Sequence, residues 1–146
     1  MEPTISTTVT TTTPVGTYLG SITFTGGLDN NYTFSFVAGD FEVTKAVLTV
    51  TADSKTKVYG AANPPLTFQY SGWVNGVETI DVEPTAATTV TTSTFVGTYP
   101  GSITLSGGSD NNYTFSFVAG DFEVTKAVLT VTADSKTKVY GTANPP

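Results

Sequence analysis

The sequence predicts an all-β fold built from tandem β-sandwich-like modules arranged end to end. Three observations support this prediction: a long internal repeat, short segments in which apolar and polar residues alternate, and turn residues that recur about every ten positions. A second architecture also fits the pattern, namely β-grasp-like modules in which residues 72–81 form a vestigial single helical turn. No longer helix is indicated anywhere in the chain.

The repeat has an offset of 81 residues and predicts the module boundaries. Asn31–Gly60 returns letter for letter as Asn112–Gly141, and 55 of the 65 positions that overlap at this offset are identical. The phase of the strand-like segments predicts one complete module at residues 46–126. Residues 1–45 are then the back part of a preceding repeat, and residues 127–146 are the front part of a following one.

The front half of the complete module contains two predicted strands joined by extended chain. Residues 47–52 form the first strand, residues 55–60 continue extended as far as a glycine, and residues 66–70 form another strand after a rigid proline connector. The alternation along the first strand indicates one buried face, which carries Leu48, Val50 and Ala52.

The back half is richer in threonine and aromatic residues, which favour strands. Threonine-rich residues 88–94 and residues 101–105 are strand candidates. Residues 113–118 alternate aromatic and small residues, so we expect a half-buried strand. Ala119 and Gly120 then form a short turn, and the strand pairs as a hairpin with one that contains Phe122 and Val124.

The two incomplete flanks predict contacts between modules. A front fragment of twenty residues buries too little apolar surface to fold alone, whereas the back fragment leaves a strand edge open. Neighbouring repeats of the same protein are the expected partners, and head-to-tail complementation between copies of the chain is a second route. Both an arbitrary excerpt of a longer array, which we favour, and a filament protomer agree with the sequence.

Composition excludes several functional classes. The net charge is -6, and all six basic residues are lysines, so no basic surface for nucleic acid is expected. The chain has no cysteine and no histidine, and hence no common metal site, cofactor site or catalytic triad is predicted. No apolar run is long enough to insert into a membrane. We therefore do not expect an enzyme.

Several short motifs lie in a fixed order along the complete module: KVYG at 57–60, NPPLTF at 63–68, SGWVNG at 71–76, VGTY at 96–99 and NYTFSFVAGDFEVTKA at 112–127. This combination resembles the MBG-type repeat in its YGX form, and the resemblance covers the whole chain, once completely and twice in part. It implies a β-rich, repetitive role at the bacterial cell surface, in adhesin-like proteins outside the cell. It carries over no catalytic or binding residue.

Two features are candidate binding sites. Tyr70 and Trp73 could form an aromatic platform for a sugar ring, or could simply pack in the core of the module. Asp110-Asn111-Asn112, mirrored at residues 29–31, offers oxygen ligands for calcium, although these residue types are also common in tight turns. The triplets that begin at Asn31 and Asn112 match the acceptor pattern for N-linked glycosylation.

The sequence thus favours a structural function. We expect a segment of an extracellular bacterial stalk, adhesin or filament that extends or assembles end to end through β modules, with strand complementation between chains as one route. The alternative is a carbohydrate-binding surface module that uses exposed aromatic residues, with glycan as its partner.

Overall fold

The computed structural model describes all residues, 1–146, and contains strands but no helix. The predicted all-β class is therefore confirmed. The ten strands are β1 (Thr4–Thr7), β2 (Gly16–Thr25), β3 (Gly39–Val43), β4 (Ala46–Ala52), β5 (Lys55–Val58), β6 (Phe68–Ser71), β7 (Thr85–Thr88), β8 (Gly97–Ser106), β9 (Tyr113–Val118) and β10 (Gly120–Thr125).

Strands β4 to β10 form two sheets, here called the central sandwich. One sheet has the order β6-β4-β9 and the other has the order β5-β10-β8-β7. Two pairings are parallel, β4 with β9 and β5 with β10, and the others are antiparallel. Parallel strands need a long connection. Between β6 and β9, which lie on opposite edges of their sheet, the chain forms β7 and β8 of the other sheet.

The core of the central sandwich lies between these two sheets. Leu48, Val50 and Ala52 are buried on one face of β4, as the alternation predicted. Residues of β4 meet residues of β8 and β10 in a single apolar cluster, which consists of Val50, Ala52, Val90, Ile103, Leu105, Phe122 and Val124. Since both sheets contribute to one cluster, they are packed face to face.

Strands β1, β2 and β3 form a separate antiparallel sheet, here called the N-terminal sheet. Its pairing repeats that of β7, β8 and β10. Thr4 pairs with Thr25 where Thr85 pairs with Ser106, and Gly16 pairs with Val43 as Gly97 does with Val124. The same residues therefore give the same local register in both copies.

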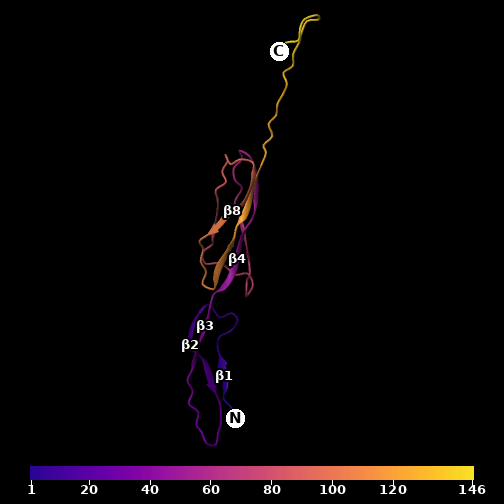
Figure 1. The fold of residues 1–146 in the computed structure, drawn as a ribbon. Coiled ribbons are helices and arrows are strands. Elements are labelled where there is room, and N and C mark those ends of the chain that lie inside the picture. The colour runs from indigo at the N-terminus through magenta and orange to yellow at the C-terminus, as the bar shows by residue number, and fades with distance from the viewer.

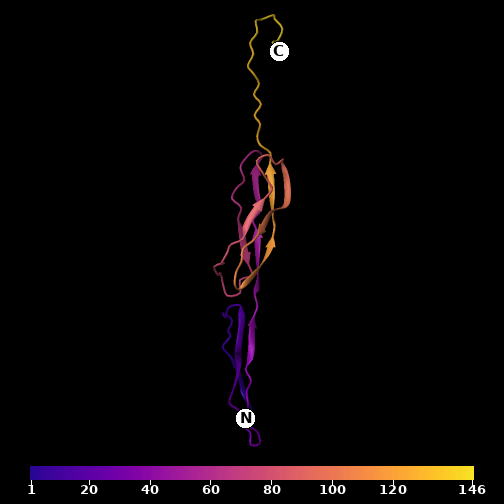
Figure 2. The ribbon, with the colours of Figure 1, turned by 90° about the vertical axis from the view of Figure 1, so that its left-hand side faces the viewer.

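The molecule is elongated. Figures 1 and 2 show the N-terminal sheet at one end, the central sandwich in the middle and residues 127–146 running away from the opposite end. These last residues form no strand and are exposed throughout. No helix of the structure is long and apolar enough to cross a membrane.

The predicted hairpin at residues 113–124 is wrong. β9 and β10 lie in different sheets, because the chain crosses from one sheet to the other at Ala119. A single residue is too short to reverse the chain within one sheet, where the shortest common hairpin loops have two residues. Alternation alone does not distinguish a reversal from such a crossing.

Other element predictions need smaller corrections. The helical turn expected at residues 72–81 is absent, and the chain there follows bends. The strand predicted at residues 88–94 is wrong, because β7 ends at Thr88 and the following residues form a turn, in which the Thr91 N–H donates to the Thr94 hydroxyl at 2.8 Å. β8 is longer than predicted and begins at Gly97.

Candidate functional site

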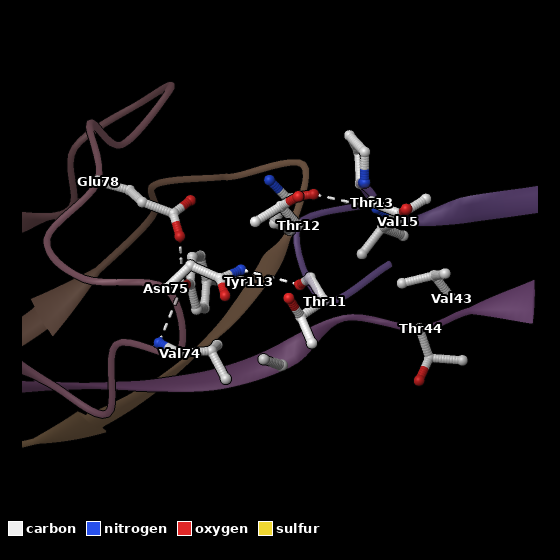
Figure 3. A pocket seen from close by; sticks show the side chains of 13 residues that line it. Thr11, Thr12, Thr13, Val15, Val43, Thr44, Val74, Asn75, Glu78 and Tyr113 are labelled. Carbon is white, nitrogen blue, oxygen red and sulfur yellow. Dashed lines mark hydrogen bonds between the residues drawn. The ribbon is translucent and has the colours of Figure 1, made fainter. Parts of the chain in front are cut away.

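A concave surface lies at the junction between the N-terminal sheet and the central sandwich. It is an open groove of about 410 Å³ that both parts line. The loop between β1 and β2 forms one wall, and the loop after β6, together with the start of β9, forms the other (Figure 3). The candidate functional site is therefore a contact between two repeats.

Three hydrogen bonds cross this junction, and they involve both backbone and side-chain groups. The Lys45 ammonium donates to the Asp110 carbonyl at 2.6 Å. The Val15 N–H donates to the Asn112 Oδ1 at 3.0 Å, and the Asn75 side-chain amide donates to the Thr11 carbonyl at 3.2 Å. These bonds fix the orientation of one part relative to the other.

The covalent connection at the junction is equally short. Only Thr44 and Lys45 separate β3 from β4, and the Ala46 N–H already donates to the Asn112 carbonyl at 2.9 Å. The chain therefore passes from the N-terminal sheet into the central sandwich without a loop that could act as a hinge.

The ionisable groups of the groove are bound to one another. The Tyr113 hydroxyl donates to Glu78 Oε1 at 2.9 Å and accepts a bond of 3.3 Å from the Val74 N–H. Burial raises the pKa of Tyr113, and the bond to Glu78 adds to this effect. The groove thus presents hydroxyl, amide and carboxylate groups in a hydrogen-bonded wall.

Tyr70 and Trp73, the predicted glycan contacts, do lie side by side. Their ring centroids are 5.5 Å apart, and Trp73 also packs edge-on against Tyr113 at 5.5 Å. Both side chains are half-buried against the apolar cluster of Leu48, Ile80 and Tyr113. The Tyr70 hydroxyl donates to Glu83, and burial, together with that bond, raises the pKa of Tyr70. The pair therefore belongs to an aromatic cluster that covers the end of the core.

Asp110 closes the turn before β9. Its Oδ1 accepts hydrogen bonds from the N–H groups of Asn112 at 2.7 Å and Tyr113 at 3.0 Å. Asp29 makes the equivalent bonds to Asn31 and Tyr32 at 2.7 and 3.1 Å. The structure contains no group of three acidic residues close enough to hold a metal ion. In this structure the repeated Asp-Asn-Asn motif forms a turn.

Sequence reasoning missed one buried charge. Lys57 is almost fully buried, and its ammonium donates to the carbonyl oxygens of Thr91 at 2.5 Å and Ala61 at 3.2 Å. It also lies 6.0 Å from the centre of the Phe122 ring. Alternation along β5 could not have identified it, because that pattern favours Val58 as the inward residue, whereas Val58 is exposed and Lys57 is buried.

Comparison with known proteins identifies the family. No curated protein and no solved structure matches the chain. The profile of the MBG domain (YGX type) matches residues 2–42 and again residues 48–123. The two matches together cover most of the chain, so this protein belongs to the MBG domain (YGX type) family.

Proposed function

We propose that the chain is a structural tandem-repeat segment of an extracellular bacterial stalk, adhesin or filament, in which β modules are joined end to end. The single observation that carries this proposal is the junction. A connection of only Thr44 and Lys45, with three hydrogen bonds across it, suits a part whose task is to hold its neighbour at a fixed distance and direction.

The chemistry of the junction supports the same role. Its side chains bond to backbone groups across the contact, and the groove contains none of the usual nucleophile and base pairs. We propose no enzymatic activity. A location at the cell surface, outside the cell, agrees with the MBG domain family, whose members are typical of secreted surface proteins.

A spin-label experiment tests whether the junction is stiff. The chain has no cysteine, so labels at Thr17→Cys in β2 and Thr98→Cys in β8, which are exposed and equivalent positions, report one distance across the junction. In dilute solution we expect a single narrow distance distribution by pulsed dipolar spectroscopy. A broad distribution in the unmodified junction would contradict the stalk.

A matched pair of variants tests whether one hydrogen bond keeps the junction stiff. Asn112→Ala removes the acceptor of the Val15 N–H, and we expect it to broaden the distribution. Asn31→Ala changes the corresponding residue of the other copy, whose side chain makes no contact across the junction, and should leave the distribution narrow. Equal effects of the two variants would show that the hydrogen bond does not hold the junction.

The alternative is a carbohydrate-binding surface module that uses Tyr70 and Trp73. Trp73 is the only tryptophan in the chain, so its fluorescence reports directly on that surface. Because both rings pack in the aromatic cluster, we expect no spectral shift on titration with neutral or acidic oligosaccharides. A saturable shift that Trp73→Phe abolishes would favour the carbohydrate-binding alternative.

A further inference from the structure

The same sequence occurs in two different states within this molecule. In the central sandwich, β4 pairs with β9 and β5 pairs with β10. Residues 32–43 repeat the sequence of β9 and β10, but have no counterpart of β4 and β5 beside them. Residues 127–139 repeat the sequence of β4 and β5, and they pair with nothing.

In the N-terminal sheet, the surface that would receive such a pair of strands is uncovered, and this surface is here called the acceptor. Phe122 is 0% exposed and Tyr113 is 2% exposed where the partner strands are present. Their counterparts without partner strands, Phe41 and Tyr32, are 37% and 76% exposed. Residues 32–37 also fail to form a strand, although β9 has the same sequence. An apolar face is therefore open at the edge of this sheet.

Residues 127–139, here called the donor, are uncovered in the same way. Leu48 and Val50 of β4 are both 0% exposed, whereas their counterparts Leu129 and Val131 are both 87% exposed. Val128 corresponds to Val47, which points outward in the sandwich and is itself 62% exposed. Leu129 and Val131 are thus exposed in the C-terminal segment although the sandwich buries their counterparts.

The acceptor is already shaped for such a strand pair. Asp29 closes the same turn as Asp110, and the Thr13 N–H donates to the Thr10 carbonyl at 3.2 Å, as Thr94 does to Thr91 at 3.1 Å. Pairing within the N-terminal sheet also has the register of the sandwich. Binding would therefore order the donor and residues 32–37, whereas the rest of the acceptor already has its bound pairing.

From these observations we propose that residues 126–144 of one chain bind the N-terminal sheet of a second copy, head to tail. This inference rests on the proposed function as an end-to-end repeat and names its partner. The register of the sandwich, moved by one repeat, places Ala127 beside Tyr32 and Val131 beside Phe36. The following strand places Lys136 beside Phe41.

Polar contacts repeat along with the strands. Lys138 corresponds to Lys57 and would donate to the Thr10 carbonyl, as Lys57 donates to Thr91. Asn63 donates to the Val90 carbonyl at 2.6 Å, so Asn144 would donate to Val9. Donor and acceptor thus match in polar groups as well as in apolar ones, and burial would leave neither lysine nor carbonyl without a partner.

The two binding regions lie at opposite ends of the molecule (Figures 1 and 2). A contact between different surfaces that does not close on itself generates an open chain of copies, so the expected product is a filament. The proposed contact involves counterparts of β4 and β5 but none of β6, so it pairs fewer strands than the sandwich does. Assembly should therefore be weaker than folding of the sandwich and should depend on protein concentration.

Light scattering after size exclusion tests the proposal on the 146-residue chain. We expect the mass to rise with concentration and filaments to be visible by negative-stain electron microscopy. Leu129→Asp should lower the association constant on the order of tenfold to a hundredfold, because it places a charge on the buried face of the donor. Val128→Asp is the matched control and should assemble like the unmodified chain, because its side chain faces solvent in both states.

A second variant blocks the acceptor. A Cβ on Gly120 would lie 2.7 Å from the Ala52 carbonyl oxygen, whereas a Cβ on Gly39 meets nothing closer than Ile22 at 3.5 Å. Gly39→Ala should therefore leave the free chain folded but exclude the donor strand. Mixing Gly39→Ala with Leu129→Asp, each with one working end, should give dimers and no filaments.

A folded chain that stays monomeric up to about millimolar concentration would overturn the proposal, as would assembly that Leu129→Asp and Gly39→Ala leave unchanged. Either result is independent of the spin-label distance in dilute solution. A monomer with a narrow distance distribution would reject complementation and keep the stalk, whereas assembly with a broad distribution would reject the stiff junction.

Discussion

At the scale of single residues, the structure depends on buried and half-buried polar side chains that bond to backbone carbonyls or to carboxylates. Lys57 is the clearest case, because its ammonium is held by two carbonyl oxygens under the Phe122 ring. Tyr70 and Tyr113 are held by carboxylates at the other end of the sandwich. Each of these groups connects elements that are distant in the sequence.

Replacement of Lys57 should be costly. We expect Lys57→Met to keep the apolar stem but lose both hydrogen bonds, which lowers the free energy of unfolding by about 1 to 3 kcal/mol. Urea unfolding of dilute protein measures this change. Lys138→Met alters the same residue in the exposed copy of the segment and should change stability by less than about 0.5 kcal/mol. A small effect of Lys57→Met would mean that the buried ammonium contributes little.

Alkaline pH should destabilise the sandwich. The pKa values of Tyr70 and Tyr113 are raised from 10.0 in the folded protein, so above pH 10 the unfolded chain releases protons that the folded chain retains. Stability is then fully present below pH 10 and falls as the pH rises further. Melting temperatures from pH 8 to pH 12 should show the loss, and the Tyr70→Phe and Tyr113→Phe variants should show less of it. An equally steep loss in those variants would assign it to other groups.

At the scale of elements, one sequence has two conformations. Residues 32–37 and β9 are identical, yet only β9 is a strand, because β4 lies beside it. Alternation predicted the buried face of β4 and the existence of most strands. It could not predict that β9 and β10 belong to different sheets or that two pairings are parallel, since these depend on contacts between distant residues. The junction groove also could not be predicted from the sequence, because its walls come from separate repeats.

The crossing between the two sheets depends on a residue without a side chain. Gly120→Ala would place a methyl group 2.7 Å from the Ala52 carbonyl oxygen, and we expect a loss of about 1 to 3 kcal/mol in unfolding free energy. Thermal or urea unfolding measures it. Gly39→Ala is the matched control in the dilute monomer, where no strand covers that position. Similar losses in both variants would contradict the steric explanation.

At the scale of the whole molecule, the proposed stiff rod rests on the short connection and on the hydrogen bonds of Lys45, Asn75 and Asn112. The two copies of the Val-Thr-Lys-Ala-Val sequence, at residues 43–47 and 124–128, differ in whether they lie at a junction. Lys45 lies within the junction, and Lys126 begins the segment that no other part of the monomer contacts. The module boundaries predicted at residues 46 and 126 remain a prediction.

Limited trypsin digestion tests those boundaries in dilute solution. Cleavage after Lys126, Lys136 and Lys138 should come first, because these residues lie in extended, exposed chain. Cleavage after Lys45 should be slower, since the Ala46 N–H is bonded to Asn112 and the Lys45 ammonium to Asp110. Mass spectrometry should therefore find a persistent fragment of residues 1–126. Early cleavage after Lys45 would mean that the junction opens readily.

The most direct test of the end-to-end account is the measurement of residual dipolar couplings on the dilute, weakly aligned chain. A rigid junction predicts that one alignment tensor fits the amide couplings of the N-terminal sheet and the central sandwich together, in the orientation that the structure shows (Figure 1). Two different tensors, with reduced alignment for the N-terminal sheet, would show that the two parts move independently and would contradict the stalk.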